Sequence, residues 1–299
     1  MFDMKKLVLL LMFVCIAPLA SAEERLSVVT SVKPLQLVAN AIVADLGDVE
    51  VLIPAGSSPH HYSLKPSGIR TLNNADLIVW VGPSLEQFLT KVLQRADAPV
   101  LQLLEVSDAD VDDQETESSE HDEHHHHHHG GEDPHVWMDP LLMLDAAEKI
   151  KNALSAQHPQ HAVQLEKNYQ AFADELLMAE KQVRQQLIPY QKAGFVVFHD
   201  AFALLVEHYG LNQKAFFTVD PARAPGAKKL ATIQELLKTQ KVGCVFVEPQ
   251  FEAAVIKQIV SDLPVKMGQL DPLAIDVTLA QGYPGYLQQL GSNIERCLK

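Results

Sequence analysis

The chain has 299 residues, 47% of them hydrophobic, and a formal net charge of −14 at pH 7. This length and apolar content suffice for two lobes that each bury a core. So acidic a chain is a poor nucleic-acid binder and a reasonable partner for cations.

The first 22 residues predict a secretory signal peptide. Two lysines form a positively charged start, residues 7–17 form an apolar run, and Ala-Ser-Ala at residues 20–22 is a small-residue cleavage site. The apolar run is too short to span a bilayer, and no later stretch is long enough. Cleavage would remove one acidic and two basic residues, which leaves a charge of about −15. We therefore expect a soluble exported protein that begins near Glu23.

Strands and helices alternate through residues 23–160, which we expect to form an N-terminal lobe. The predicted strands cover residues 26–32, 49–53, 76–82 and 100–103. One helix is predicted over residues 34–44, and three more are predicted to begin at Pro66, Pro83 and Pro140. The run DLIVWVG at residues 76–82 is typical of a strand that is buried on both faces of a parallel sheet. The alternation predicts an α/β lobe with such a sheet.

A long helix over residues 161–189 is expected to link this lobe to a second one over residues 190–299. The helix has apolar residues on one side and no Gly or Pro before Pro189. At 1.5 Å per residue it would be about 40 Å long, enough to join two lobes rigidly. Beyond it, strands are predicted over residues 194–198, 216–219, 242–248 and 265–270. Helices are predicted over residues 201–209, 251–262 and 282–298, and a further helix is predicted to end at Gln240. The second lobe is therefore also α/β.

The segment 108–133 contains eleven carboxylates and a dense group of histidines. It is polar and of low complexity, so we expect a mobile loop. Imidazoles packed among carboxylates form a soft polydentate trap for divalent transition metals. The histidines predicted to form this accessory metal loop are His121, His124, His125, His126, His127, His128 and His129. The alternatives are a purification tag and an acidic spacer.

Three further histidines occupy comparable places in the predicted lobes. His60 lies in a loop after a strand, His135 precedes a helix, and His199 ends a strand. Ligands of open α/β sheets gather beyond the carboxyl ends of the strands. A lone histidine is more often structural, but three of them on elements of both lobes favour a shared metal site, with His61 as an accessory contact at most. The remaining histidines are expected to be solvated or capping residues: His158, His161 and His208.

Only two cysteines, Cys244 and Cys297, would remain after removal of the signal peptide. Two thiols in an exported protein most often pair. A disulfide that closes a loop of this length would stabilise the fold by roughly 4 kcal/mol. A two-cysteine metal site is the weaker alternative, because the chain has no Cys-x-x-Cys spacing.

A series of short motifs resembles the periplasmic solute-binding proteins of zinc ABC importers, the ZnuA type. The motifs are Pro59-His60-x-Tyr62, Asp133-Pro134-His135-Val136-Trp137, Phe198-His199-Asp200-Ala201-Phe202, the loop from Asp220 to Gly226, Glu248-Pro249-Gln250-Phe251 and Leu270-Asp271-Pro272-Leu273. They run from about residue 26 to the end of the chain. Their order, their spacing and the acidic histidine-rich insertion make the resemblance specific.

The resemblance implies two lobes joined by a long helix, with Zn²⁺ bound between them by His60, His135 and His199. Many relatives supply a carboxylate at the position of Asp271, whereas Pro59 stands where some zinc-binding relatives have Glu. The fourth ligand would therefore be Asp271 or water. Manganese-binding relatives have Glu at the position of His199, so its histidine favours zinc, as does the chemistry of three imidazoles.

Two carboxylates and two cysteines lie near this inferred site or match the family. Asp200 and Glu248 would accept hydrogen bonds from ligand imidazoles and fix their tautomers. The alternatives are a carboxylate at a helix N-terminus for Asp200 and a strand-end salt bridge for Glu248. Cys244 and Cys297 match the disulfide of such relatives.

The predicted function is capture of periplasmic Zn²⁺ and its delivery to the membrane permease of an ABC transporter, by a monomer that neither inserts into the membrane nor binds nucleic acid. The histidine-rich loop would bind zinc more weakly, because flexible ligands must be ordered, and would concentrate zinc or sense its excess. The alternatives are a periplasmic zinc buffer and a zinc hydrolase, since three histidines with an open position are also a catalytic arrangement. The chain has no His-Glu-x-x-His and no nucleophile elbow, so we expect no enzyme.

Overall fold

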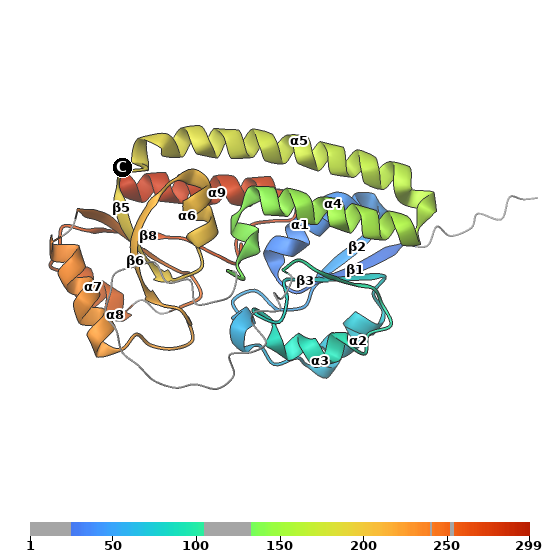
Figure 1. Ribbon diagram of the computed structural model, residues 1–299, viewed down its shortest axis with the longest axis horizontal. Helices are drawn as coiled ribbons and strands as arrows, with labels where there is room; N and C mark the ends of the chain where they lie inside the picture. Colours follow the sequence, from blue (N-terminus) through green and yellow to red (C-terminus); the bar gives the residue numbers. More distant parts are fainter. Residues whose placement is uncertain (1–24, 105–132, 240, 252–253) are drawn as a thin grey trace, which may run out of the picture.

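The computed structural model describes residues 25–104, 133–239, 241–251 and 254–299. The predicted signal peptide and the histidines of the predicted accessory loop lie outside these residues. Two separate sheets are arranged side by side beneath a layer of long helices (Figure 1). Within the described part of the chain, no helix has the length and apolarity needed to cross a membrane.

The first sheet is parallel and four-stranded, with the order β2-β1-β3-β4. Its strands are β1 (Leu26–Thr30), β2 (Gly47–Val51), β3 (Leu77–Trp80) and β4 (Val100–Gln102). Helices α1 (Lys33–Val43) and α4 (Pro140–Gln157) pack on one face, and α2 (Pro66–Asn73) and α3 (Thr90–Leu93) pack on the other. Because helices cover both faces, β3 is buried along its whole length, as its apolar sequence predicted.

The helix predicted to begin at Pro83 is not formed there. The chain makes a turn instead, and a short helix, α3, begins only at Thr90. The fully buried carboxylate of Glu86 accepts hydrogen bonds from the backbone N–H groups of Val81 (3.4 Å) and Gly82 (3.0 Å). The Leu85 and Glu86 N–H groups both donate to the Gly82 carbonyl (3.1 and 2.9 Å), and the backbone of Glu86 then leaves the helical conformation, so only a single turn forms.

The second sheet is also parallel and four-stranded, with the order β6-β5-β7-β8. Its strands are β5 (Gly194–His199), β6 (Asn212–Thr218), β7 (Val242–Val247) and β8 (Lys266–Gln269). Helices α6 (Ala203–Tyr209) and α9 (Gly282–Leu298) cover one face, and α7 (Ala227–Thr239) and α8 (Ala254–Val260) cover the other. Strand β6 begins four residues earlier than predicted, because Asn212 and its polar neighbours pair with the start of β5.

The predicted linking helix is the continuous helix α5 (Ala162–Leu187), which extends across both lobes (Figure 1). It packs on α1 and α4 of the first lobe and on α9 of the second. One continuous apolar core runs through these helices, from Leu26 on β1 to Ile294 on α9. The predicted fold is therefore confirmed, and the lobe boundaries at residues 160 and 190 remain predictions.

Of the three histidines expected to be solvated or capping, His161 and His208 have largely buried side chains. His161 immediately precedes α5 and is 3% exposed, while the His208 side chain is 6% exposed. His208 Nε2 lies 3.0 Å from Glu180 on α5, and its Nδ1 lies 3.3 Å from Asp139. Burial opposes protonation of His208, but the two carboxylates outweigh burial and raise its pKa above the usual range. His158 is the C-cap residue of α4 and His161 the N-cap residue of α5, two positions of the capping kind that was predicted.

The predicted disulfide joins Cys244 on β7 to Cys297 on α9, with the two Cα atoms 5.9 Å apart. The neighbouring strand β8 approaches this bridge closely at Gly268. A Cβ atom on Gly268 would lie 2.8 Å from the sulfur of Cys297, so this position requires glycine. The bridge fastens the last helix to the centre of the second sheet.

Candidate metal centre

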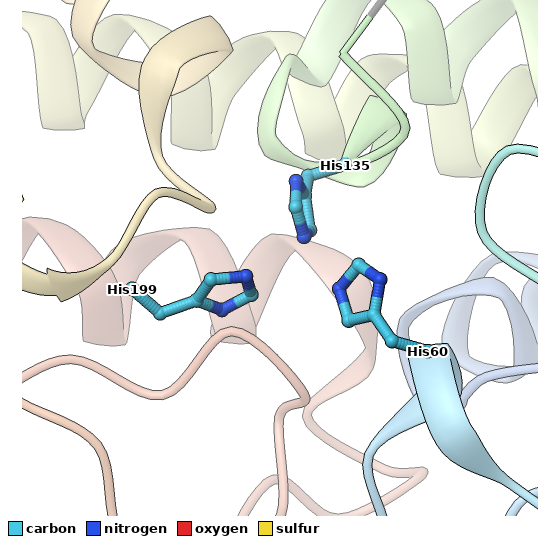
Figure 2. A group of neighbouring side chains, drawn as sticks. All are labelled: His60, His135 and His199. Atoms are coloured by element: carbon cyan, nitrogen blue, oxygen red, sulfur yellow. The ribbon is translucent and has the colours of Figure 1, made fainter. Parts of the chain in front are cut away.

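Three predicted site residues, His60, His135 and His199, converge between the two sheets. His60 belongs to the short helical turn Pro59–His61, His135 precedes the turn Val136–Met138, and His199 is the last residue of β5. One nitrogen of each ring lies within 4.8 Å of the others. The ring centroids are 5.0 to 5.5 Å apart, and Figure 2 shows the rings turned toward a common space. The arrangement brings elements from both lobes to one point.

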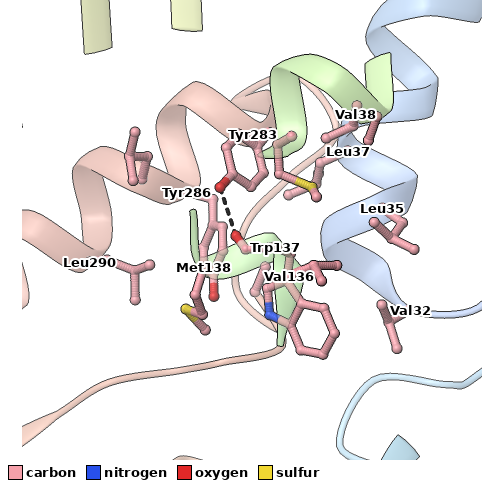
Figure 3. Packing of buried hydrophobic residues seen from close by; sticks show 14 of the residues in the cluster. Val32, Leu35, Leu37, Val38, Val136, Trp137, Met138, Tyr283, Tyr286 and Leu290 are labelled. Carbon is pink, nitrogen blue, oxygen red and sulfur yellow. Dashed lines mark hydrogen bonds between the residues drawn. The ribbon is translucent and has the colours of Figure 1, made fainter. Parts of the chain in front are cut away.

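The turn after His135 is anchored by the wholly buried side chain of Trp137. The indole Nε1–H donates a hydrogen bond to the carbonyl of Pro272 (2.7 Å), and the Tyr283 hydroxyl donates one to the carbonyl of Trp137 (2.7 Å). Figure 3 shows this turn packed between α1 and α9. Two residues later, Asp139 accepts the Leu141 N–H (2.7 Å) and caps α4. His135 therefore stands on a fixed piece of backbone.

Asp133 orients His135, a role that the sequence analysis did not assign. Its Oδ1 lies 2.7 Å from His135 Nδ1 and accepts the His135 backbone N–H at 3.0 Å. Burial of Asp133 opposes ionisation, but the contacts with His135 outweigh burial and hold the pKa of Asp133 below its usual range. With Nδ1 occupied, His135 Nε2 is the free ligand atom. The carboxylate two residues before the histidine was the available signal.

Of the two carboxylates expected to support ligand imidazoles, Glu248 lies beside a histidine. Its Oε1 is 3.4 Å from His199 Nδ1, and both side chains are buried. Asp200 instead accepts a hydrogen bond from Gln213 at 3.4 Å. Burial and the nearby Asp133 raise the pKa of Asp200. A supporting role for either carboxylate remains a prediction.

Asp271 lies outside the group of three histidines. Its Oδ1 accepts hydrogen bonds from the Gln250 side chain (2.7 Å) and the Leu273 N–H (2.9 Å), and its Oδ2 accepts one from the Ile275 N–H. These contacts fix the chain that follows β8. His61 also points away from the group, toward Asp220.

The three histidines line a cavity of about 10 Å³, which holds a single particle the size of a water molecule. Within the described residues, Nε2 of His60, Nε2 of His135 and both ring nitrogens of His199 are buried without a hydrogen-bond partner. Buried polar atoms are rarely left unpaired in a folded protein. Three imidazole nitrogens around a space for one ion suit a tetrahedral transition metal such as zinc.

The position of His60 makes the metal-free chain sensitive to acid. Burial, and secondarily the His135 and His199 rings, lower the pKa of His60 to about 3. Below pH 6.5 the unfolded chain therefore binds a proton at His60 that the folded chain does not bind until about pH 3. The free energy of unfolding therefore decreases as the pH is lowered through this window, by up to about 2 kcal/mol at pH 5.

Replacing His60 with leucine removes this acid sensitivity. Between pH 7.5 and pH 5, the unfolding free energy of the metal-free variant should improve relative to the parent by up to about 2 kcal/mol. Urea unfolding at the two pH values measures the difference. Parallel pH dependence of the two chains would show that His60 is not protected from protonation.

The chain matches known proteins along nearly its whole length. A family model described as "Zinc-uptake complex component A periplasmic" (ZnuA) matches residues 28–297. The chain is 39% identical to the high-affinity zinc uptake system protein ZnuA of Haemophilus ducreyi, covering 98% of this chain and 99% of that protein. It is 38% identical to the protein of the same name from Yersinia pestis, covering 91% of each.

The fold of this chain is also similar to that of a solved structure. The Zn(II)-bound ZnuA-like domain of Streptococcus pneumoniae AdcA superposes with a TM-score of 0.73 at 25% identity, covering 92% of this chain and 99% of that one. The sequence match, the two parallel sheets and the three converging histidines agree with one another. The chain belongs to the ZnuA family, the periplasmic component A of zinc-uptake complexes.

Proposed function

We propose that this protein captures Zn²⁺ in the periplasm and delivers it to the permease of an ABC importer. The observation that carries the proposal is the set of buried, unpartnered imidazole nitrogens around a cavity for one ion. In this proposal His60, His135 and His199 bind the metal, and Glu248 supports His199. The family and the names of the relatives agree with this role.

The fourth position on the metal belongs to water or to Asp271. The contacts of Asp271 favour water, because both of its carboxylate oxygens already accept hydrogen bonds. A hydrolase would use such an open position for its substrate. Membership of a family of zinc-uptake components supports transport rather than catalysis.

The rest of the proposal concerns export and partners. Residues 1–22 direct export and are cleaved, so the mature chain begins near Glu23. The histidine-rich loop serves as an accessory metal site that is weaker than the cavity. The mature protein acts as a monomer, and its partner is the membrane permease.

A competitive zinc titration against a chelator of known affinity tests the proposal. It would use the chain from Glu23 and the same chain without residues 108–131. One tightly bound zinc in both chains is expected. Loss of tight binding with the loop would make the protein a histidine-rich buffer. Adding the zinc-loaded chain to vesicles that contain the permease and ATP would then separate delivery from storage.

Removing the Asp133 carboxylate should weaken zinc binding without changing the number of ions bound. Asp133→Ala leaves His135 Nδ1 without its partner and frees the ring to rotate, so the affinity should fall about 10-fold to 100-fold. Asp133→Asn keeps an acceptor and should lose less. The titration above measures both variants, and an unchanged affinity for Asp133→Ala would show that Asp133 does not position the ring.

A further inference from the structure

The segment that carries His60 is held less firmly than the segments that carry the other two histidines. His60 belongs to irregular chain between β2 and α2, much of which is exposed. His135 and His199 are buried, on an anchored turn and on a strand. Local opening begins where backbone is exposed and few buried contacts hold it. Release of a metal from this site should therefore begin with movement of His60.

A side-chain contact across the cavity joins this segment to the second lobe. His61 Nε2 lies 2.8 Å from Oδ2 of Asp220. Asp220 belongs to the loop after β6, and its neighbour Pro221 lines the cavity, as do Pro59 and His60. The contact therefore connects two sides of the cavity, each next to a residue that lines it.

Asp220 is a fixed acceptor within its own loop. Its Oδ1 accepts the Ala222 N–H (3.0 Å), and its backbone N–H and carbonyl both contact the Thr218 hydroxyl (3.1 and 2.7 Å). Its Oδ2 remains for His61 and for the exposed guanidinium of Arg223, whose Nε lies 3.0 Å away. Burial opposes ionisation of Asp220, but its hydrogen bonds, first that with His61, lower its pKa. A charged acceptor forms a stronger hydrogen bond than a neutral one.

We propose that His61 and Asp220 form a latch that slows the release of zinc from the cavity. The proposal rests on the proposed zinc-binding function and adds two positioning residues to it. The His61 side chain is 50% exposed and is not in the histidine group, so it acts on the metal only through the position of His60. An exposed pair of this kind contributes little to global stability, but it opposes local opening of the segment that carries a ligand.

Stopped-flow release of zinc tests the latch. The mature chain, loaded with half an equivalent of zinc, is mixed with excess EDTA, and the release rate is recorded. His61→Phe and Asp220→Ala should each release zinc about fivefold faster, the factor expected for one hydrogen bond. The double variant should be no faster than the faster single variant, because both changes remove the same contact. The variants should bind zinc at the same association rate as the parent, and each should still bind one zinc ion tightly.

Matched variants distinguish the latch from other causes. Asp48→Asn removes an exposed carboxylate that pairs with Arg25 at the start of β2, and it should release zinc at the parent rate. His61→Gln keeps an N–H donor and should restore most of the slow release, which also shows that replacement of His61 does not unfold the segment. Unchanged rates in His61→Phe and Asp220→Ala, with one tight zinc still bound, would overturn the latch alone. A parent chain without a tight zinc would instead overturn the proposed function.

Discussion

Replacing His199 with alanine should weaken zinc binding by about a thousandfold. Structural zinc sites in small domains bind with about 10–16 kcal/mol, so the loss of one of three imidazoles costs about 4 kcal/mol. His199 is buried at the end of β5, a central strand of the second sheet, which holds its ring in place. The measurement is the competitive titration of the mature chain that lacks residues 108–131, which isolates the cavity from the accessory loop.

The control for this experiment is a histidine outside the metal centre. His158→Ala changes a residue at the end of α4, whose Nε2 lies 3.9 Å from Asp76. This variant should bind zinc with the affinity of the parent. Equal affinities for His199→Ala and the parent would mean that the tight site lies elsewhere in the chain.

Removing the disulfide should lower the free energy of unfolding by roughly 4 kcal/mol, the value for a closed loop of about 50 residues in the unfolded chain. Cys244 and Cys297 are 53 residues apart, and both are buried. The double variant Cys244→Ala, Cys297→Ala avoids a free thiol and would be compared with the parent by urea unfolding of the zinc-free chains.

Reduction of the parent provides an independent check on the same bond. Unfolding in the presence of a reductant should move the urea midpoint of the parent toward that of the double variant, and it should leave the variant unchanged. A double variant as stable as the oxidised parent would show that the bridge does not constrain the unfolded chain.

The fold was predictable where a local pattern determines the structure. The apolar run of β3 predicted a strand covered on both faces, and the one-sided apolar pattern of α5 predicted a long amphipathic helix. The helix expected at Pro83 was wrong: the segment forms a single turn, and the backbone leaves the helical conformation at the buried Glu86. The partners of His208, on α5 and before α4, are distant in sequence, so no local pattern indicated that its side chain would be enclosed.

The same distinction applies to the metal centre. His60, His135 and His199 could be selected because each lies next to a predicted strand or helix, in segments that resemble a known family. Their convergence depends on contacts that the sequence does not reveal, such as that between Trp137 and Pro272, which are 135 residues apart. The pair formed by His61 and Asp220, 159 residues apart, has no sequence signal either.

The continuous core beneath α5 limits how a partner can recognise the loaded protein. Because α1, α4, α5 and α9 pack together across both lobes, bending the lobes apart would expose apolar surface along the whole helical layer. If zinc binds as proposed, its arrival would change the loops at the mouth of the cavity, around His60 and Pro221, more than the angle between the lobes. A permease that accepts only the loaded protein, as proposed, would then have to recognise the shape of that mouth and not the angle between the lobes.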